Sequence, residues 1–243
     1  LTRKILVPFC PESKLSGVGH KDFMPAVWYR RTFELPADWS VGRVLLHFGA
    51  VDYDAEIWIN GQSVGKHRGG YSSFHFDITS ELRPGTNTVT VYAEDDNRTG
   101  LQPRGKQSER YESHGCDYTR TTGIWQTVWL EHVPNVSIAS FKLYPDPDNA
   151  CVHIEAKLRG PAAGCALEAA ASYGGKQVGR ASARISGPSV RLTLTVSEVH
   201  LWQPGDPKLY DLKLKVSGGA AAPDQVESYF GLRSIRLDGM AFR

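Results

Sequence analysis

The stretch AEIWINGQSVGK, residues 55–66, shows the pattern on which the fold depends. Its alanine and two isoleucines occupy every second position, and a strand sends alternate side chains to opposite faces of a sheet. Asn60-Gly61 follows directly, and both residue types tolerate the positive φ that a type I′ turn requires. The stretch therefore predicts an antiparallel hairpin in which residues 62–66 return along the first strand.

Outward from this hairpin, the same period of two recurs in residues 44–48, 74–78 and 89–93, and a further strand over residues 125–131 ends this block. Each segment fits a strand with one buried face and one exposed face, and in residues 44–48 the exposed face is expected to carry Leu45 and His47. A short helical turn is expected near residues 79–82, and no convincing amphipathic helix is found in the sequence. Short strands separated by turn residues are typical of a sandwich or a jelly roll.

A second block of alternating sequence begins after Pro134-Asn135, where the first pattern breaks. Apolar residues occupy every second position in residues 152–158, 190–196 and 210–216. Repeated over a span of about 100 residues, this alternation fits a seven-strand immunoglobulin-like sandwich.

The predicted fold class is therefore all-β. We expect a jelly-roll β-sandwich over residues 1–134 and an immunoglobulin-like β-sandwich over residues 135–237. A length of 243 residues suits two cores of ordinary size. Hydrophobic residues make up 41% and charged residues 22% of the chain, which are values for a globular protein and not for a disordered one.

The charge balance limits the classes of partner. The 28 basic and 26 acidic residues give a formal net charge of +2, too small for a domain-wide field that attracts nucleic acid or anionic lipid. No apolar run approaches the roughly 20 residues that cross a bilayer. We expect no nucleic-acid and no membrane partner. The chain does not begin with Met, so the compartment stays open, with the cytoplasm slightly favoured over the periplasm or export.

The four cysteines, Cys10, Cys116, Cys151 and Cys165, are too few and too widely spaced for a disulfide scaffold in a chain of this length. We expect free thiols. His114 near Cys116 comes closest to the spacing of metal ligands, but a tetrahedral site needs further ligands and none sits nearby. We therefore expect no metal and no other cofactor.

One long stretch, residues 95–122, lacks a strand pattern. A loop of this length in a compact domain is usually functional or disordered. It combines carboxylate, amide and guanidinium groups with aromatic rings, in Asp95, Asp96, Asn97, Arg98, Gln102, Arg104, Lys106, Gln107, Glu109, Arg110, Tyr111, Asp117, Tyr118 and Arg120. A sugar hydroxyl donates and accepts hydrogen bonds at once, and a ring can cover the apolar side of the sugar. The content of the loop therefore favours sugar recognition.

Several motifs occur in a fixed order along the chain: WYRRTF (28–33), FGAVDY (48–53) through WINGQ (58–62) to Gly70-Tyr71, and TTGIWQTVWL (121–130). They resemble the sugar-binding domain of family 2 glycoside hydrolases, which include β-galactosidases and β-glucuronidases. LWQP (201–204) with PKLY (207–210), and YFGLRSI (229–235), resemble the end of that family's immunoglobulin-like domain and its exit into a catalytic barrel. The resemblance covers essentially the whole chain and implies that residues 238–243 begin the barrel.

The resemblance also implies roles for residues of the loop. Counted back from the glycine of the TTGIW motif, Asp117 falls where family members carry an Asp that binds substrate hydroxyls, and Arg120 lies near the same contact. Asn97, Arg104 and Gln107 belong to stretches that resemble a subgroup pattern and are further candidates for substrate binding. Structural alternatives stay open: Asp117 could cap a turn or pair with Arg120, and the other three could be solvated or bridge domains.

The resemblance implies a part of an enzyme. Retaining glycosidases use two carboxyl groups about 5 Å apart, and in this family both come from the barrel, so the chain alone is expected to be inactive. The intact protein is expected to be a retaining O-glycosyl hydrolase whose pocket the loop helps to form. Its expected partners are a glycoside, its own C-terminal barrel and, in an oligomer, further copies. An autonomous carbohydrate-binding, lectin-like module and an adhesion or assembly protein are the alternatives.

Overall fold

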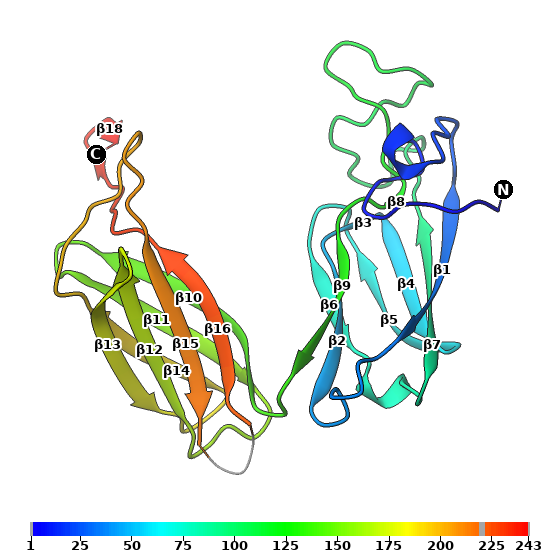
Figure 1. Cartoon of the computed structure of the whole chain (residues 1–243). Helices are drawn as coiled ribbons and strands as arrows, with labels where there is room; N and C mark the ends of the chain where they lie inside the picture. The colour runs from blue at the N-terminus through cyan, green and yellow to red at the C-terminus, as the bar shows by residue number, and fades with distance from the viewer. Residues whose placement is uncertain (1, 219–221, 243) are drawn as a thin grey trace. The chain divides into compact units, whose positions relative to one another are not determined.

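The computed structural model describes residues 2–218 and 222–242. Within them, the fold is all-β apart from two short 3-10 helices, η1 (Lys14–Ser16) and η2 (Thr79–Glu81). No helix in this part of the chain has the length and apolar character to cross a membrane. The chain forms two compact units, Leu1–His132 and Val133–Arg243 (Figure 1). Leu1, residues 219–221 and Arg243, which fall within the predicted domains, lie outside the described residues.

The first unit is a β-sandwich. One sheet holds four antiparallel strands in the order β1 (Ala26–Glu34), β7 (Thr86–Glu94), β4 (Asp54–Ile59) and β5 (Gln62–Arg68). The second sheet holds β6 (Phe74–Asp77), β2 (Arg43–Phe48) and β9 (Val128–Val133). A short pair, β3 (Val51–Asp52) with β8 (Gly123–Ile124), lies at one end of the sandwich (Figure 1).

The hairpin predicted from residues 55–66 is confirmed. Asn60 and Gly61 connect β4 to β5 with φ angles of 52° and 85°. Ile57 and Ile59 are completely buried and pack with Phe48 of the other sheet. Burial of one such side chain contributes about 1.5 to 3 kcal/mol, so the alternating residues hold the two sheets together. The helical turn expected near residues 79–82 is η2.

Two details of this unit differ from the sequence prediction. Leu45 was expected on the exposed face of its strand, but it is 2% exposed, so β2 is covered on both faces at that point. A strand was expected to begin at Trp125, but β9 begins at Val128. Trp125 instead donates its indole N–H to the carbonyl of Gly70 at 2.8 Å, outside the sheet.

The second unit is the predicted immunoglobulin-like sandwich. One sheet has the order β10 (Ser137–Asp146), β11 (Cys151–Arg159) and β14 (Ser189–Thr195). The other has the order β13 (Lys176–Arg184), β12 (Ala166–Tyr173), β15 (Tyr210–Ser217) and β16 (Asp224–Phe230). The alternation of buried and exposed residues along β11, β14 and β15 is the one that the sequence predicted.

The last described residues form a small hairpin of β17 (Leu237–Asp238) and β18 (Ala241–Phe242). That residues 238–243 begin a barrel stays a prediction, because nothing in the hairpin itself tests it.

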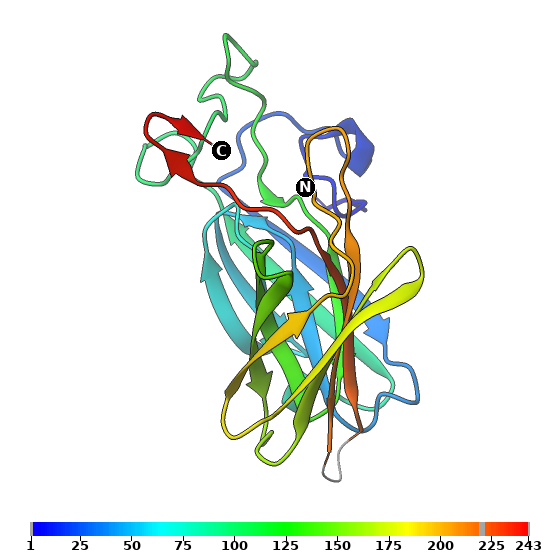
Figure 2. The same ribbon diagram turned by 90° about the vertical axis from the view of Figure 1, so that its left-hand side faces the viewer.

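The segment between β7 and β8, residues 95–122, is the loop that the sequence singled out. It extends beyond the ends of the two sheets in both views of the unit (Figures 1 and 2). Isolated bridges join Gln107 to Tyr118 and His114 to Asp117 and make the loop compact. The N-terminal segment lies against its base, because the main-chain N–H of Thr122 donates to Glu12 Oε1 at 3.2 Å.

Candidate functional site

Three buried carboxyl groups lie where the loop meets the sandwich. Glu12 is 4% exposed, Asp52 1% and Asp95 3%. Burial raises the pKa of all three above their ordinary values. A buried carboxylate must accept hydrogen bonds to avoid a large desolvation cost. The donors around these three groups therefore show what holds the loop.

Asp95 is bonded by donors from both ends of the loop. Its Oδ2 accepts from Asn97 Nδ2 at 2.5 Å and from Thr122 Oγ1 at 3.1 Å. Its Oδ1 accepts from Gln102 Nε2 at 2.6 Å. Asn97 is 5% exposed, so this predicted site residue lies in the base of the loop, where it fixes the exit from β7.

Asp52 comes from β3 and is bonded by a donor in the middle of the loop. Its Oδ2 accepts from Gln107 Nε2 at 2.7 Å and faces Thr121 Oγ1 at 3.5 Å. Burial, with the nearby charge of Asp95, raises the pKa of Asp52 to about 7. The carboxyl packs so closely on Gly70 that a side chain at that position would collide with it. Gln107 is completely buried in this contact.

Arg120 is also buried, at 2% exposure. Its Nη1 donates to the carbonyls of Ser108 and Arg110, at 3.3 and 2.5 Å, and its Nη2 donates to the carbonyl of Lys21. The guanidinium also lies over the ring of Phe23, 3.8 Å from its centroid. One side chain thus ties two points of the loop to the N-terminal segment.

A second group of side chains lies farther out on the loop and is called the rim cluster: Arg104, Glu109, His114 and Asp117. Arg104 Nη1 donates to Glu109 Oε2 at 2.7 Å, and this hydrogen bond lowers the pKa of Glu109. His114 Nε2 lies 3.8 Å from Glu109 Oε1 and 3.7 Å from Asp117 Oδ2. The Asp117 side chain keeps 25% of its surface exposed.

Aromatic rings border the rim cluster. Tyr71 and Tyr118 are 55% and 44% exposed, and their hydroxyl groups lie 3.4 Å apart. Burial of its hydroxyl and the contact with Tyr118 raise the pKa of Tyr71 to about 12. Exposed rings beside carboxylate and guanidinium groups are the combination that suits a sugar.

The five predicted site residues thus occupy two levels of the loop. Asn97, Gln107 and Arg120 lie in the buried base, and Arg104 and Asp117 lie in the rim cluster. Among the described contacts, Arg120 donates to carbonyl groups, and Asp117 pairs with His114.

The sequence interpretation missed two features of this site. Glu12 and Asp52 precede the loop by many residues, so no local pattern links them to it. His114 was expected to lack further metal ligands nearby, which is wrong: one donor atom each of His114, Glu109 and Asp117 lies within 4.8 Å of the others. The bonded Arg104 already neutralises Glu109, however, which makes this group a poor cation site.

Glu109 of the loop and Asp52 beneath it lack the features of a catalytic acid for glycoside hydrolysis. One member of such a pair must hold a proton near neutral pH. Arg104 keeps Glu109 charged, because it lowers the pKa of that group. Asp52 has the raised pKa of a candidate acid, but its carboxyl is buried beneath the loop and bonded to Gln107. The rim cluster can bind hydroxyl groups.

Comparison with known proteins gives matches to two family descriptions. Residues 16–134 match "Glycosyl hydrolases family 2, sugar binding domain", and residues 136–233 match "Glycosyl hydrolases family 2". The chain belongs to glycoside hydrolase family 2. Its first unit is the sugar-binding domain of the family, and its second unit is the immunoglobulin-like domain.

Individual family 2 proteins align with much of the chain. A β-glucuronidase from Paenibacillus borealis is 26% identical over 241 residues, which cover 91% of this chain and 38% of the relative. A β-galactosidase from Thermoanaerobacter pseudethanolicus is 31% identical over 130 residues, which cover 51% of this chain and 16% of the relative.

The structure of Bifidobacterium dentium β-glucuronidase complexed with coumarin-3-O-glucuronide superposes with a TM-score of 0.76. It is 22% identical and covers 98% of this chain and 44% of that chain, which shows a shared fold. This family 2 chain therefore spans less than half the length of each of these three relatives.

Proposed function

We propose that this chain is the non-catalytic front portion of a retaining O-glycoside hydrolase of the β-galactosidase and β-glucuronidase type. The loop of residues 95–122 then helps to form the substrate pocket of a following (β/α)8 barrel. Membership of family 2 and the greater length of the glycosidase relatives support this proposal. Both catalytic carboxyl groups come from the barrel, so the chain alone is inactive.

The observation that carries the proposal is the contrast between the two levels of the loop. Its base is fixed by buried hydrogen bonds from Asn97, Gln107 and Arg120. Above this base, the Asp117 carboxylate remains partly exposed. A binding group is most effective when rigid neighbours hold it before the ligand arrives, since less ordering is then needed on binding.

Asp117 accepts hydrogen bonds from hydroxyl groups of the sugar in this proposal. Arg104 supports it from the same rim cluster by holding Glu109, which in turn lies beside His114. Asn97, Gln107 and Arg120 act on the substrate only through the loop that they hold. A barrel, and further copies of the chain in an oligomer, are the proposed protein partners.

Kinetics of the intact enzyme test the role of Asp117. Asp117→Asn keeps the size of the side chain and removes the charge that accepts substrate hydroxyls. We expect kcat/KM to fall by an amount equivalent to about 1 to 3 kcal/mol of transition-state binding. The matched control is Asp96→Asn, because Asp96 lies on the same loop and bonds locally to Thr99. Wild-type kinetics in a folded Asp117→Asn enzyme would remove Asp117 from the pocket.

A specific observation favours the autonomous carbohydrate-binding module as a second candidate. Trp28, Trp58 and Tyr92 form an aromatic cluster on the outer face of the four-stranded sheet. Trp28 is 66% exposed and lies 5.5 Å from Trp58 and 4.7 Å from Tyr92, between ring centroids. Exposed rings in such an arrangement can cover the apolar face of a sugar without help from a barrel.

Isothermal titration of the isolated chain distinguishes the two candidates. If the loop only completes a barrel pocket, a monosaccharide should bind with a Kd of about 1 mM or weaker, which corresponds to about −4 kcal/mol. Micromolar binding that Trp28→Ala abolishes would favour the autonomous module. The reading frame beyond Arg243 gives a second test. Some 300 further residues of alternating strands and helices would favour the front portion of a glycoside hydrolase, since a (β/α)8 barrel typically needs about 250 or more residues.

A further inference from the structure

The hairpin between β10 and β11 brings three metal-binding side-chain types to one place in the second unit. Asp146 is the last residue of β10, and it pairs directly with Cys151, the first residue of β11. His153 lies two positions farther along β11, so its side chain points to the same face as that of Cys151. Val152 and Ile154 point to the core and are completely buried. The carboxylate, thiol and imidazole therefore share the outer face.

The three donor atoms are close enough to bind one ion. Cys151 Sγ lies 3.9 Å from His153 Nε2, which lies 3.8 Å from Asp146 Oδ2. One donor atom of each residue lies within 4.8 Å of the others. Two ligands of a tetrahedral Zn²⁺ are about 3.3 to 3.7 Å apart, given bond lengths of about 2.0 to 2.3 Å. Small side-chain rotations are enough to close the difference.

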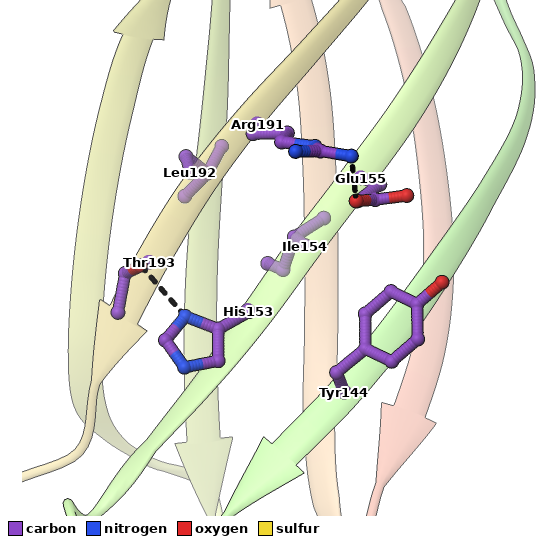
Figure 3. A pocket seen from close by; sticks show the side chains of 7 residues that line it. All are labelled: Tyr144, His153, Ile154, Glu155, Arg191, Leu192 and Thr193. Atoms are coloured by element: carbon purple, nitrogen blue, oxygen red, sulfur yellow. Dashed lines mark hydrogen bonds and ion pairs between the residues drawn. The ribbon is translucent and has the colours of Figure 1, made fainter.

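The ring nitrogen of His153 that faces away from Cys151 and Asp146 has a polar partner. His153 Nδ1 lies 2.9 Å from Thr193 Oγ1 on β14, as the dashed line in Figure 3 shows. When Nδ1 donates to this hydroxyl, Nε2 carries the free lone pair that a metal requires. A partner of this kind on the far ring nitrogen is the usual support of a metal-bound histidine.

The other two ligands are held in place as well. Asp146 Oδ1 accepts from the main-chain N–H of Asn149 at 3.1 Å, and Oδ2 accepts from Asn149 Nδ2 at 2.7 Å. Cys151 is 4% exposed, yet its side chain is directed to the outer face, where its thiol meets His153.

We propose that Asp146, Cys151 and His153 form a Zn²⁺ site on the immunoglobulin-like domain, with a fourth position open to water. Thiolate and imidazole ligands favour Zn²⁺ over Mg²⁺ or Ca²⁺, which prefer oxygen.

His153 also lines a hollow of about 430 Å³ with Tyr144, Glu155 and Arg191, which gives water access to the imidazole (Figure 3). Arg191 is paired with Glu155 at 2.6 Å and does not compete for the Asp146 carboxylate there.

Titration of the whole chain with Co²⁺ tests this site, because a cobalt–thiolate bond gives a charge-transfer absorption band. We expect the band to saturate at one ion per chain and to disappear when Zn²⁺ is added. Cys151→Ser should abolish it. The matched control is Cys116→Ser, which removes the thiol nearest to the rim cluster and should leave the band unchanged.

Three results would overturn the proposal: no band in the unmodified chain, a band that persists in Cys151→Ser, or a band that Cys116→Ser removes. If circular dichroism shows that Cys151→Ser does not fold, His153→Gln replaces it as the test. The His153 side chain is 50% exposed, so this substitution should leave the fold intact. It should weaken Co²⁺ binding at least tenfold. Unchanged binding in His153→Gln would count against the site.

Discussion

Gln107 Nε2 donates to Asp52 Oδ2 at 2.7 Å and so joins the middle of the loop to a strand residue 55 positions earlier in the chain. The same side chain accepts, through Oε1, from the main-chain N–H of Thr121 at 2.8 Å. One buried amide thus connects β3, the middle of the loop and the segment that enters β8. The rigidity proposed for the Asp117 region depends on such contacts.

We predict that Gln107→Ala destabilises the chain by about 2 to 4 kcal/mol. The substitution leaves the Thr121 N–H without its partner, and Asp52 Oδ2 keeps the 3.5 Å contact with Thr121 Oγ1 in place of a short hydrogen bond. Urea unfolding measures the change. Lys106→Ala is the matched control, since Lys106 is exposed and its side chain should contribute little. Equal stability of the two variants would mean that the Gln107 contact does not hold the loop.

Arg120→Lys should destabilise the chain by about 2 to 4 kcal/mol, because a lysine cannot donate to three carbonyl groups in the planar geometry of a guanidinium. Hydrogen exchange should become faster in residues 108–121. Arg98→Lys is the control, since Arg98 also lies over the ring of Phe23, at 4.4 Å, but is exposed. Unchanged exchange in Arg120→Lys would contradict the anchoring role.

The buried carboxyl of Asp52 should make stability depend on pH. Its pKa is about 7 in the folded state and near 3.8 in the unfolded state. Between these two pH values the folded chain binds more protons than the unfolded chain. The contribution of Asp52 to stability is therefore complete below pH 4 and is lost as the pH rises to about 7. The loss is at most about 4 kcal/mol, since one pKa unit is worth about 1.4 kcal/mol.

Asp52→Asn removes this titration. We expect the variant to match the wild type at pH 4 and to be more stable at pH 8, by urea unfolding at each pH. Asp96→Asn should show the opposite dependence of stability on pH. Hydrogen bonds from Thr99 lower the pKa of Asp96, so the contribution of Asp96 to stability is lost as the pH falls. An Asp52→Asn chain that is less stable than wild type at pH 8 would contradict the assigned direction.

The strands could be predicted from the sequence because their pattern is local. Ile57 and Ile59 alternate with polar or outward-facing neighbours, and Asn60-Gly61 marks the turn between β4 and β5. Each of these signals depends on residues a few positions apart. The same reasoning was wrong at Leu45, whose burial depends on what covers the second face of β2.

The polar base of the loop could not be predicted in the same way. Gln107 and Arg120 carry side chains that are mostly exposed in proteins, and the sequence interpretation assigned them to substrate binding or to solvent. Their burial depends on partners far away in the chain: Asp52 for Gln107, and Lys21 for Arg120. The sequence offered one signal for the buried partner of Gln107: Asp52 is a carboxylate directly after the apolar run that ends in Val51.

A structure of the intact enzyme with a bound substrate analogue tests the central claim most directly, through the distance from Asp117 to the nearest hydroxyl of the sugar in the cleavage site. If the loop completes the pocket, a carboxylate oxygen of Asp117 should lie within about 3.2 Å of that hydroxyl. A sugar bound in the barrel with no atom of residues 95–122 in contact with it would contradict the account.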